Sequence, residues 1–159
     1  METVAERISE RMEYFVLKPQ WGNPSPEITS WYGKLDERKL TREHYRELPQ
    51  NFLLDMKTGM DILYPDILMV PFFLVSREVR NVIRMYDEDM PFLHVILFDA
   101  RQGENVFYYL PILAEGNEDR REVIYCTQNR EQREIRIRLD LAESLLARGA
   151  EGMELEKIL

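Results

Sequence analysis

Residues 134–139 read Glu-Ile-Arg-Ile-Arg-Leu and alternate polar and apolar side chains without interruption. A period of two places successive side chains on opposite faces of a β-strand. The pattern therefore predicts a half-buried strand whose apolar face carries Ile135, Ile137 and Leu139. Its outer face is expected to carry Glu134, Arg136 and Arg138.

This strand is expected to lead into a helix and then into a closing strand. Asp140 and Glu143 have the spacing of a capping box at the helix start, and Gly149 stands where a helix commonly ends. The packed side of this helix is expected to carry Leu141, Leu145 and Leu146. Residues 153–156 then place Met153 and Leu155 on one side, so we predict that they pair into the same sheet as residues 134–139.

The centre of the chain repeats this strand, helix and strand unit. Residues 67–75, ILMVPFFLV, are apolar on both faces and predict one buried strand, with Pro71 at an edge position or a bulge. Ser76 is expected to cap a helix whose packed face carries Val79, Val82, Ile83 and Tyr86. Residues 87–91 break that helix, and residues 92–98 predict the next strand.

Three further strands are expected at residues 12–18, 106–113 and 121–127, and a short helix is expected from Thr41 to Leu48. The predicted fold class is therefore α+β, with a mixed or mostly antiparallel sheet and about three short helices on one face. We expect one domain over residues 12–159. Residues 1–11 are either a short helix or a loose charged extension.

The chain has 159 residues, a formal net charge of −8 and a single cysteine. No apolar run approaches the roughly 18 residues of a membrane helix, and the charged first residues do not resemble a secretory signal. These features predict a soluble cytoplasmic protein with no membrane partner. The negative charge makes a nucleic-acid partner unlikely in this prediction and suits a basic protein partner.

No residue pattern predicts a catalytic, metal or cofactor site. His94 is expected within a strand as a core or interface residue, and His44 on a charged surface helix. Cys126 is expected as a buried, unreactive thiol, because a reactive thiol needs an accessible, electropositive setting. Ser76 lacks the glycines of a hydrolase nucleophile turn, and the chain has no glycine-rich phosphate loop.

Three surfaces are candidates for binding another protein. The first is the proline-rich loop with its aromatic residues Trp21, Trp31 and Tyr32. The second comprises two acidic turns, which carry Asp87, Glu88, Asp89, Glu115, Glu118 and Asp119. The third is the strand face with Arg136 and Arg138, which could equally be an ordinary polar outer face.

The order of three segments resembles a known group of proteins. These segments are the opening strand MEYFVLKP, the central VPFFLVSREVRNVI and the closing RIRLDLAESLLARGAEGMELEKI. In this order they resemble the immunity proteins of bacterial polymorphic toxin systems, over about residues 12–159. The resemblance implies a non-enzymatic cytoplasmic protein that binds and neutralises a cognate toxin. It implies no particular binding residues, because the binding surface differs between members of the group.

Two other interpretations of the sequence stay open. One is a small enzyme, with hydrolysis as the reaction to test, and the other is a sheet-based regulatory or nucleic-acid-binding module. The oligomeric state does not follow from the sequence.

Overall fold

The computed structural model describes residues 13–20, 22, 24–31, 34–59, 62–118, 121–129 and 132–158. Within these ranges the chain forms two sheets and two α-helices, which confirms the predicted mixture of helix and strand in one domain. The extension expected at residues 1–11 lies outside the described residues. In the same ranges, no helix combines the length and the apolar character needed to span a membrane.

The first sheet joins the two ends of the domain. Its strand order is β11-β1-β10-β9-β8. The strands are β1 (Tyr14–Pro19), β8 (Ala114–Glu115), β9 (Ile124–Asn129), β10 (Gln132–Arg138) and β11 (Met153–Lys157). Strand β1 pairs antiparallel with β10 on one side and with β11 on the other. The prediction that residues 134–139 and 153–156 share a sheet is therefore confirmed, with β1 between them.

The second sheet is mixed. Its strand order is β2-β3-β6-β7-β5-β4. The strands are β2 (Glu27–Ile28), β3 (Asn51–Lys57), β4 (Ile67–Leu68), β5 (Leu74–Val75), β6 (Phe92–Asp99) and β7 (Glu104–Pro111). Strands β3 and β6 run parallel, whereas β6 and β7 form a long antiparallel hairpin. Gly103 closes that hairpin at a φ of 68°, a backbone conformation that favours glycine.

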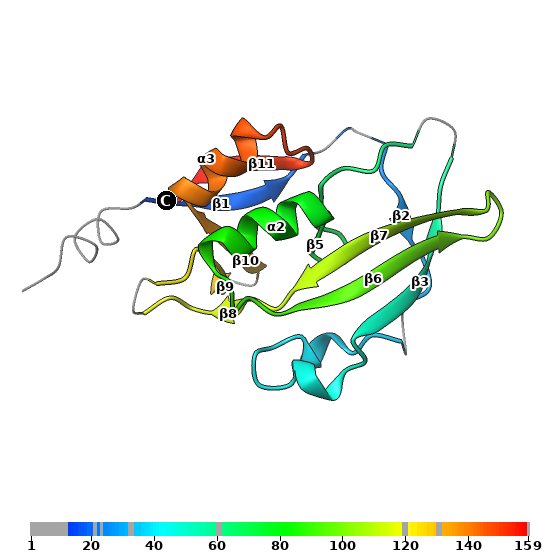
Figure 1. Ribbon diagram of the computed structural model, residues 1–159, viewed down its shortest axis with the longest axis horizontal. Coiled ribbons are helices and arrows are strands. Elements are labelled where there is room, and N and C mark those ends of the chain that lie inside the picture. Colours follow the sequence, from blue (N-terminus) through cyan, green and yellow to red (C-terminus); the bar gives the residue numbers. More distant parts are fainter. Residues whose placement is uncertain are drawn as a thin grey trace, which may run out of the picture.

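Helices α2 (Arg77–Tyr86) and α3 (Leu139–Ala147) lie side by side (Figure 1). The Tyr86 hydroxyl joins them by donating a hydrogen bond to the carbonyl oxygen of Asp140, at 3.2 Å. As predicted, Ser76 caps α2 by accepting a hydrogen bond from the backbone N–H of Val79. The capping box expected at Asp140 is wrong, because α3 begins one residue earlier, at Leu139, with Arg138 in the cap position.

The expected helix from Thr41 to Leu48 is also wrong, so the described residues contain two α-helices where about three were expected. This segment contains only the single 3-10 turn η2 (Tyr45–Glu47), and a second such turn, η1 (Glu37–Lys39), precedes it. The Thr41 side chain does accept a hydrogen bond from the backbone N–H of His44, at 3.2 Å. Such short segments gain too little from backbone hydrogen bonds to continue as a helix without tertiary support.

The apolar segment 67–75 is a hairpin and not the single strand that was expected. Strands β4 and β5 pair antiparallel, and the chain turns around Pro71 between them. Ile67 and Val75 pack into the core beneath the two helices, whereas Leu68 and Leu74 pack into a second core beside the 3-10 turns. The hairpin is apolar on both faces because it lies between these two cores.

Candidate functional site

The second sheet carries a row of exposed apolar side chains. Leu53 on β3, Ile96 on β6 and Phe107 on β7 are cross-strand partners, so their side chains stand beside one another on one face. Leu53 is 58% exposed and Phe107 is 59% exposed, while Ile96 is half-buried. Phe98, the next β6 residue on this face, is also half-buried. We call Leu53, Ile96, Phe98 and Phe107 the open sheet face.

Helix α2 covers only one end of this side of the sheet. The Arg80 guanidinium lies 4.2 Å from the ring centre of Tyr109, and the Arg84 guanidinium lies 5.1 Å from that of Phe92. A helix of 10 residues is about 15 Å long, whereas the 8 residues of β6 extend over about 26 Å. The helix is therefore too short to cover the strand, and the β6–β7 hairpin extends beyond it (Figure 1).

Hydrogen bonds hold the far end of the hairpin in place. The buried Asp99 carboxylate accepts hydrogen bonds from the backbone N–H groups of Thr58 and Arg101, both at 2.9 Å, and from the Thr58 hydroxyl. The Tyr64 hydroxyl donates to a Glu104 carboxylate oxygen at 2.5 Å. Partial burial and this carboxylate raise the pKa of Tyr64 to about 12. The open sheet face thus lies on hydrogen-bonded strands and not on a loop.

Strand β3, which supplies Leu53, was not expected from the sequence. The signal was present, because Phe52, Leu54 and Met56 alternate with more polar or exposed positions along NFLLDMK. These three side chains are buried in the second core. Leu53 breaks this alternation, because it is apolar but lies on the exposed side of the strand. A binding surface would explain an apolar side chain at this exposed position.

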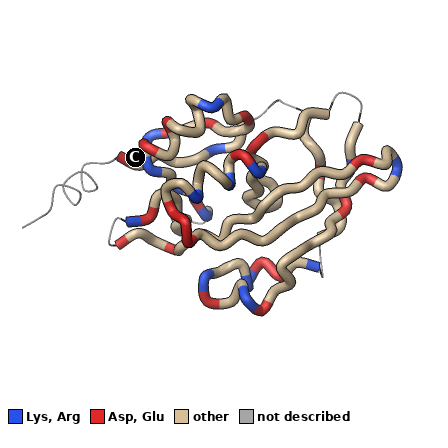
Figure 2. The backbone as a smooth tube through the Cα atoms, in the orientation of Figure 1, with Lys and Arg blue, Asp and Glu red and all other residues tan. Residues whose placement is uncertain are grey.

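The two acidic turns predicted as binding surfaces lie at the same end of the molecule (Figure 2). Asp87 ends α2, and the backbone N–H of Ile112 donates to the Pro91 carbonyl oxygen at 2.9 Å, which brings the two segments together. The exposed carboxylates of these turns are Glu88, Asp89, Glu115 and Glu118. Asp119 lies outside the described residues. This arrangement concentrates negative charge near the end of α2.

The arginine face of β10, one of the candidate binding surfaces, is largely engaged in ion pairs. Arg138 and Asp140 form a two-pronged ion pair with nitrogen–oxygen distances of 2.8 and 2.9 Å. Burial opposes ionisation of Asp140, but the hydrogen bonds from Arg138 hold its pKa below the usual range. Arg136 lies 3.3 Å from Glu134, and the Arg136 and Arg138 side chains are only 23% and 16% exposed. Both guanidinium groups are therefore largely occupied within the domain.

The aromatic loop is only partly described. Trp31 is half-buried, and its ring meets that of Phe72 edge-on, with the ring centres 5.1 Å apart. This contact places Trp31 over the second core, where it covers buried side chains. Trp21 and Tyr32 lie outside the described residues.

The candidate catalytic residues lie in separate places. His44 is exposed, with its Nδ1 atom 2.7 Å from a carboxylate oxygen of Glu47. His94 is exposed beside the open sheet face, with its ring edge-on to Tyr109. The thiol of Cys126 is buried, as predicted. None of these contacts joins a histidine to the cysteine or to Ser76.

In the ranges that the structure describes, no three His, Cys, Asp or Glu side chains gather where a metal ion could bind. The sequence matches no protein-family model and no curated protein. The functional assignment therefore depends on the surface chemistry of the chain itself.

Proposed function

We propose that this chain is a non-enzymatic immunity protein that binds and neutralises a cognate bacterial toxin domain. The observation that carries this proposal is the open sheet face, where Leu53 and Phe107 are each more than half exposed. Large apolar side chains that gather on a fixed surface commonly mark a protein interaction site. The order of the three segments resembles that of immunity proteins, and this resemblance indicates a toxin domain as the partner.

The open sheet face has the features of an interface centre. Phe107 and Leu53 would be the anchoring side chains, because buried aromatic and large apolar groups contribute most of the affinity at many interfaces. Ile96 stands between them on the central strand. A partner that covers this row removes apolar area from water without any rearrangement of the sheet.

Charge supports the same proposal. The net charge of −8 and the two acidic turns favour the approach of a basic toxin domain, such as a nuclease. Electrostatic attraction of this kind mainly raises the association rate, which then falls with added salt. The proposal places binding in the cytoplasm of the cell that makes the toxin.

Co-expression tests this proposal. The toxin domain encoded beside this gene is expressed alone, with the wild-type chain, and with the Leu53→Glu or Phe107→Glu variant. We expect the wild type to rescue growth and both variants to lose rescue. Leu146→Glu is the matched control, because Leu146, which was wrongly expected on the packed side of its helix, is 53% exposed and lies on α3. Rescue by all four proteins would remove the open sheet face from the interface, and no rescue by the wild type would contradict the function.

The experiments must also distinguish a nucleic-acid partner from a protein partner. Phe98, Phe107 and His94 share one sheet face, and single-stranded nucleic acids can stack on such aromatic groups. The net charge of −8 opposes this, since phosphate contacts need concentrated positive charge. Binding of single-stranded RNA that is lost in Phe107→Glu would therefore favour the nucleic-acid interpretation over the immunity function.

A further inference from the structure

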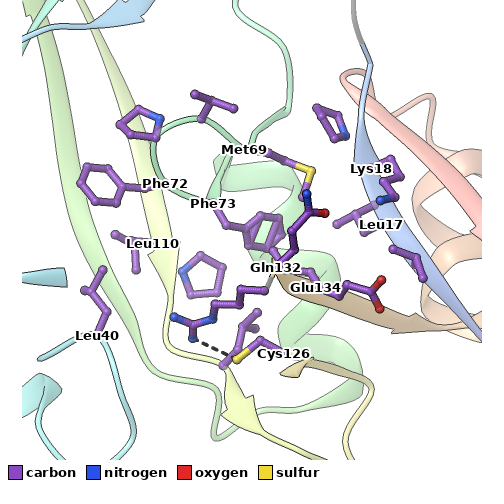
Figure 3. Close-up of a pocket in the computed structure, with 18 of the residues that line it drawn as sticks. Leu17, Lys18, Leu40, Met69, Phe72, Phe73, Leu110, Cys126, Gln132 and Glu134 are labelled. Atoms are coloured by element: carbon purple, nitrogen blue, oxygen red, sulfur yellow. Dashed lines mark hydrogen bonds between the residues drawn. The ribbon is translucent and has the colours of Figure 1, made fainter. Parts of the chain in front are cut away.

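A cavity of about 420 Å³ lies where the two sheets meet (Figure 3). One wall comes from the first sheet and includes Leu17, Ile135 and Cys126. The opposite wall includes Phe73 and Leu110, while Met69 lines the part nearest Gln132. Pockets that hold small organic molecules have volumes of about 300–1,000 Å³ and mostly apolar walls. The cavity has this size and this lining.

Arg133 places a positive charge at this cavity. Residues 133, 135 and 137 share one face of β10, and Ile137 on that face is fully buried. The Arg133 guanidinium donates a hydrogen bond to the Cys126 Sγ atom at 2.9 Å. Its side chain is 50% exposed, so the guanidinium borders both the cavity and solvent.

The guanidinium of Arg133 has unused binding capacity. A thiol sulfur is a weak acceptor, and a guanidinium carries five N–H donors. Among the described residues, Arg133 forms one ion pair, a long one of 3.8 Å with the largely exposed Glu115 side chain. Among the described residues, Cys126 is the one hydrogen-bond acceptor of this guanidinium. A ligand with a negatively charged head group would fill the remaining positions.

Apart from Arg133, the charges of the lining balance one another. The lining contains two basic residues, Lys18 and Arg133, and two acidic residues, Glu37 and Glu134. The Glu134 carboxylate is paired with Arg136 at 3.3 Å. Within the described ranges, neither Lys18 nor Glu37 forms an ion pair, and their opposite charges offset each other. The preference for an anion therefore depends on Arg133 itself.

From this geometry we propose that the cavity binds an amphiphilic monocarboxylate, a molecule with one carboxylate and an apolar body of medium length. The carboxylate pairs with Arg133, because a planar guanidinium matches the two oxygens of a carboxylate. The apolar body lies against Phe73, Leu110 and Ile135, where its burial releases water from apolar surface. This site is separate from the open sheet face and does not depend on the proposed function.

Calorimetric titration of the purified chain with decanoate tests this site. We expect saturable binding with one ligand per chain. Decanol, which has the same apolar body without the charge, should bind at least about tenfold more weakly, since a charge-assisted hydrogen bond is lost. Arg133→Gln should weaken decanoate binding by a similar factor. Arg148→Gln, an exposed arginine at the end of α3, is the matched control and should bind as the wild type does.

A second measurement places the ligand. Met69 lines the cavity, so the NMR signal of its methyl group reports on the cavity wall. Decanoate should shift this signal in the wild type, and Gln132→Trp, which fills the space near Met69, should abolish both decanoate binding and the shift. Absence of binding, equal affinity for decanol, or unchanged affinity of Arg133→Gln would each overturn the proposal.

Discussion

Gly152 lies directly against the carbonyl oxygen of Ile67. A Cβ atom at residue 152 would overlap that oxygen and also approach the Pro65 side chain, and Gly152 has a φ of +97°. Beside this contact, the Glu151 backbone N–H donates to the Asp66 carboxylate at 2.8 Å. The turn before β11 is thereby fixed to the segment before β4, so the last strand is part of the domain and not an appendage.

Gly152→Ala should therefore destabilise the protein strongly. The positive φ alone costs an alanine about 1–3 kcal/mol, and the overlap with backbone adds to that cost. We expect the free energy of unfolding to fall by about 3 kcal/mol or more. Gly149→Ala is the control, because Gly149 also has a positive φ but no atom within 4 Å of an added Cβ. Chemical denaturation of both variants measures the difference, and equal losses would contradict the contact.

Deletion of residues 150–159 should prevent cooperative folding. Strand β11 pairs with β1 along Met153–Lys157, and Met153 is buried in the core beneath the helices. Without β11 the chain loses this core contact, and the backbone N–H and C=O groups of β1 that pair with β11 become exposed. Thermal melting followed by circular dichroism is the measurement. A truncated chain with an unchanged melting transition would show that β11 is dispensable.

Much of this fold follows from local patterns. The alternation of residues 134–139 predicted β10, and Ser76 with the apolar spacing of Val79 to Tyr86 predicted α2. Each of these features depends on residues that are close together in the chain, so it can be predicted from the sequence. The sequence predicted that segment 67–75 is buried, but it did not predict that the segment forms a hairpin. A central strand and a hairpin between two cores are both apolar on two faces, so the pattern does not distinguish them.

The binding surface was harder to predict than the fold. An apolar residue on a strand is expected to face a core, and Leu53 and Phe107 do not. Their exposure results from the length of α2 relative to the β6–β7 hairpin, which no local pattern reveals. Conversely, the ion pair between Arg138 and Asp140 occupies an arginine that appeared available. Helix α3 begins at Leu139, so Asp140 is turned toward that arginine.

The stability of the β6–β7 hairpin should depend on pH through Asp99. The hydrogen bond from the Thr58 hydroxyl holds the pKa of Asp99 below its usual value, against the effect of burial, and backbone N–H groups add to this. A carboxyl with a lowered folded pKa stabilises the protein above its unfolded pKa of about 3.9 and loses that effect as pH falls through the folded pKa. Asp99→Asn should thus lower the melting temperature at pH 7, and this difference from the wild type should disappear toward pH 3. A difference between wild type and variant that is constant over this range would contradict the role of the ionised carboxylate.

We expect the purified protein to hold no stoichiometric transition metal. Its soft and borderline ligands are one cysteine and two histidines, and Cys126 is buried whereas His44 and His94 are exposed on different segments. Elemental analysis by mass spectrometry measures this directly. A metal present at one equivalent and lost on mutation of His44 or His94 would favour the enzyme interpretation instead.

The most direct test of the immunity function is a calorimetric titration of the purified chain into the purified toxin domain encoded beside it. We predict one-to-one binding by the wild type and by Leu146→Glu. Phe107→Glu should weaken this binding by at least about thirtyfold, the equivalent of the roughly 2 kcal/mol expected for an anchoring side chain. Absence of binding by the wild type would contradict the proposed function, and equal affinity of Phe107→Glu would contradict the open sheet face as its site.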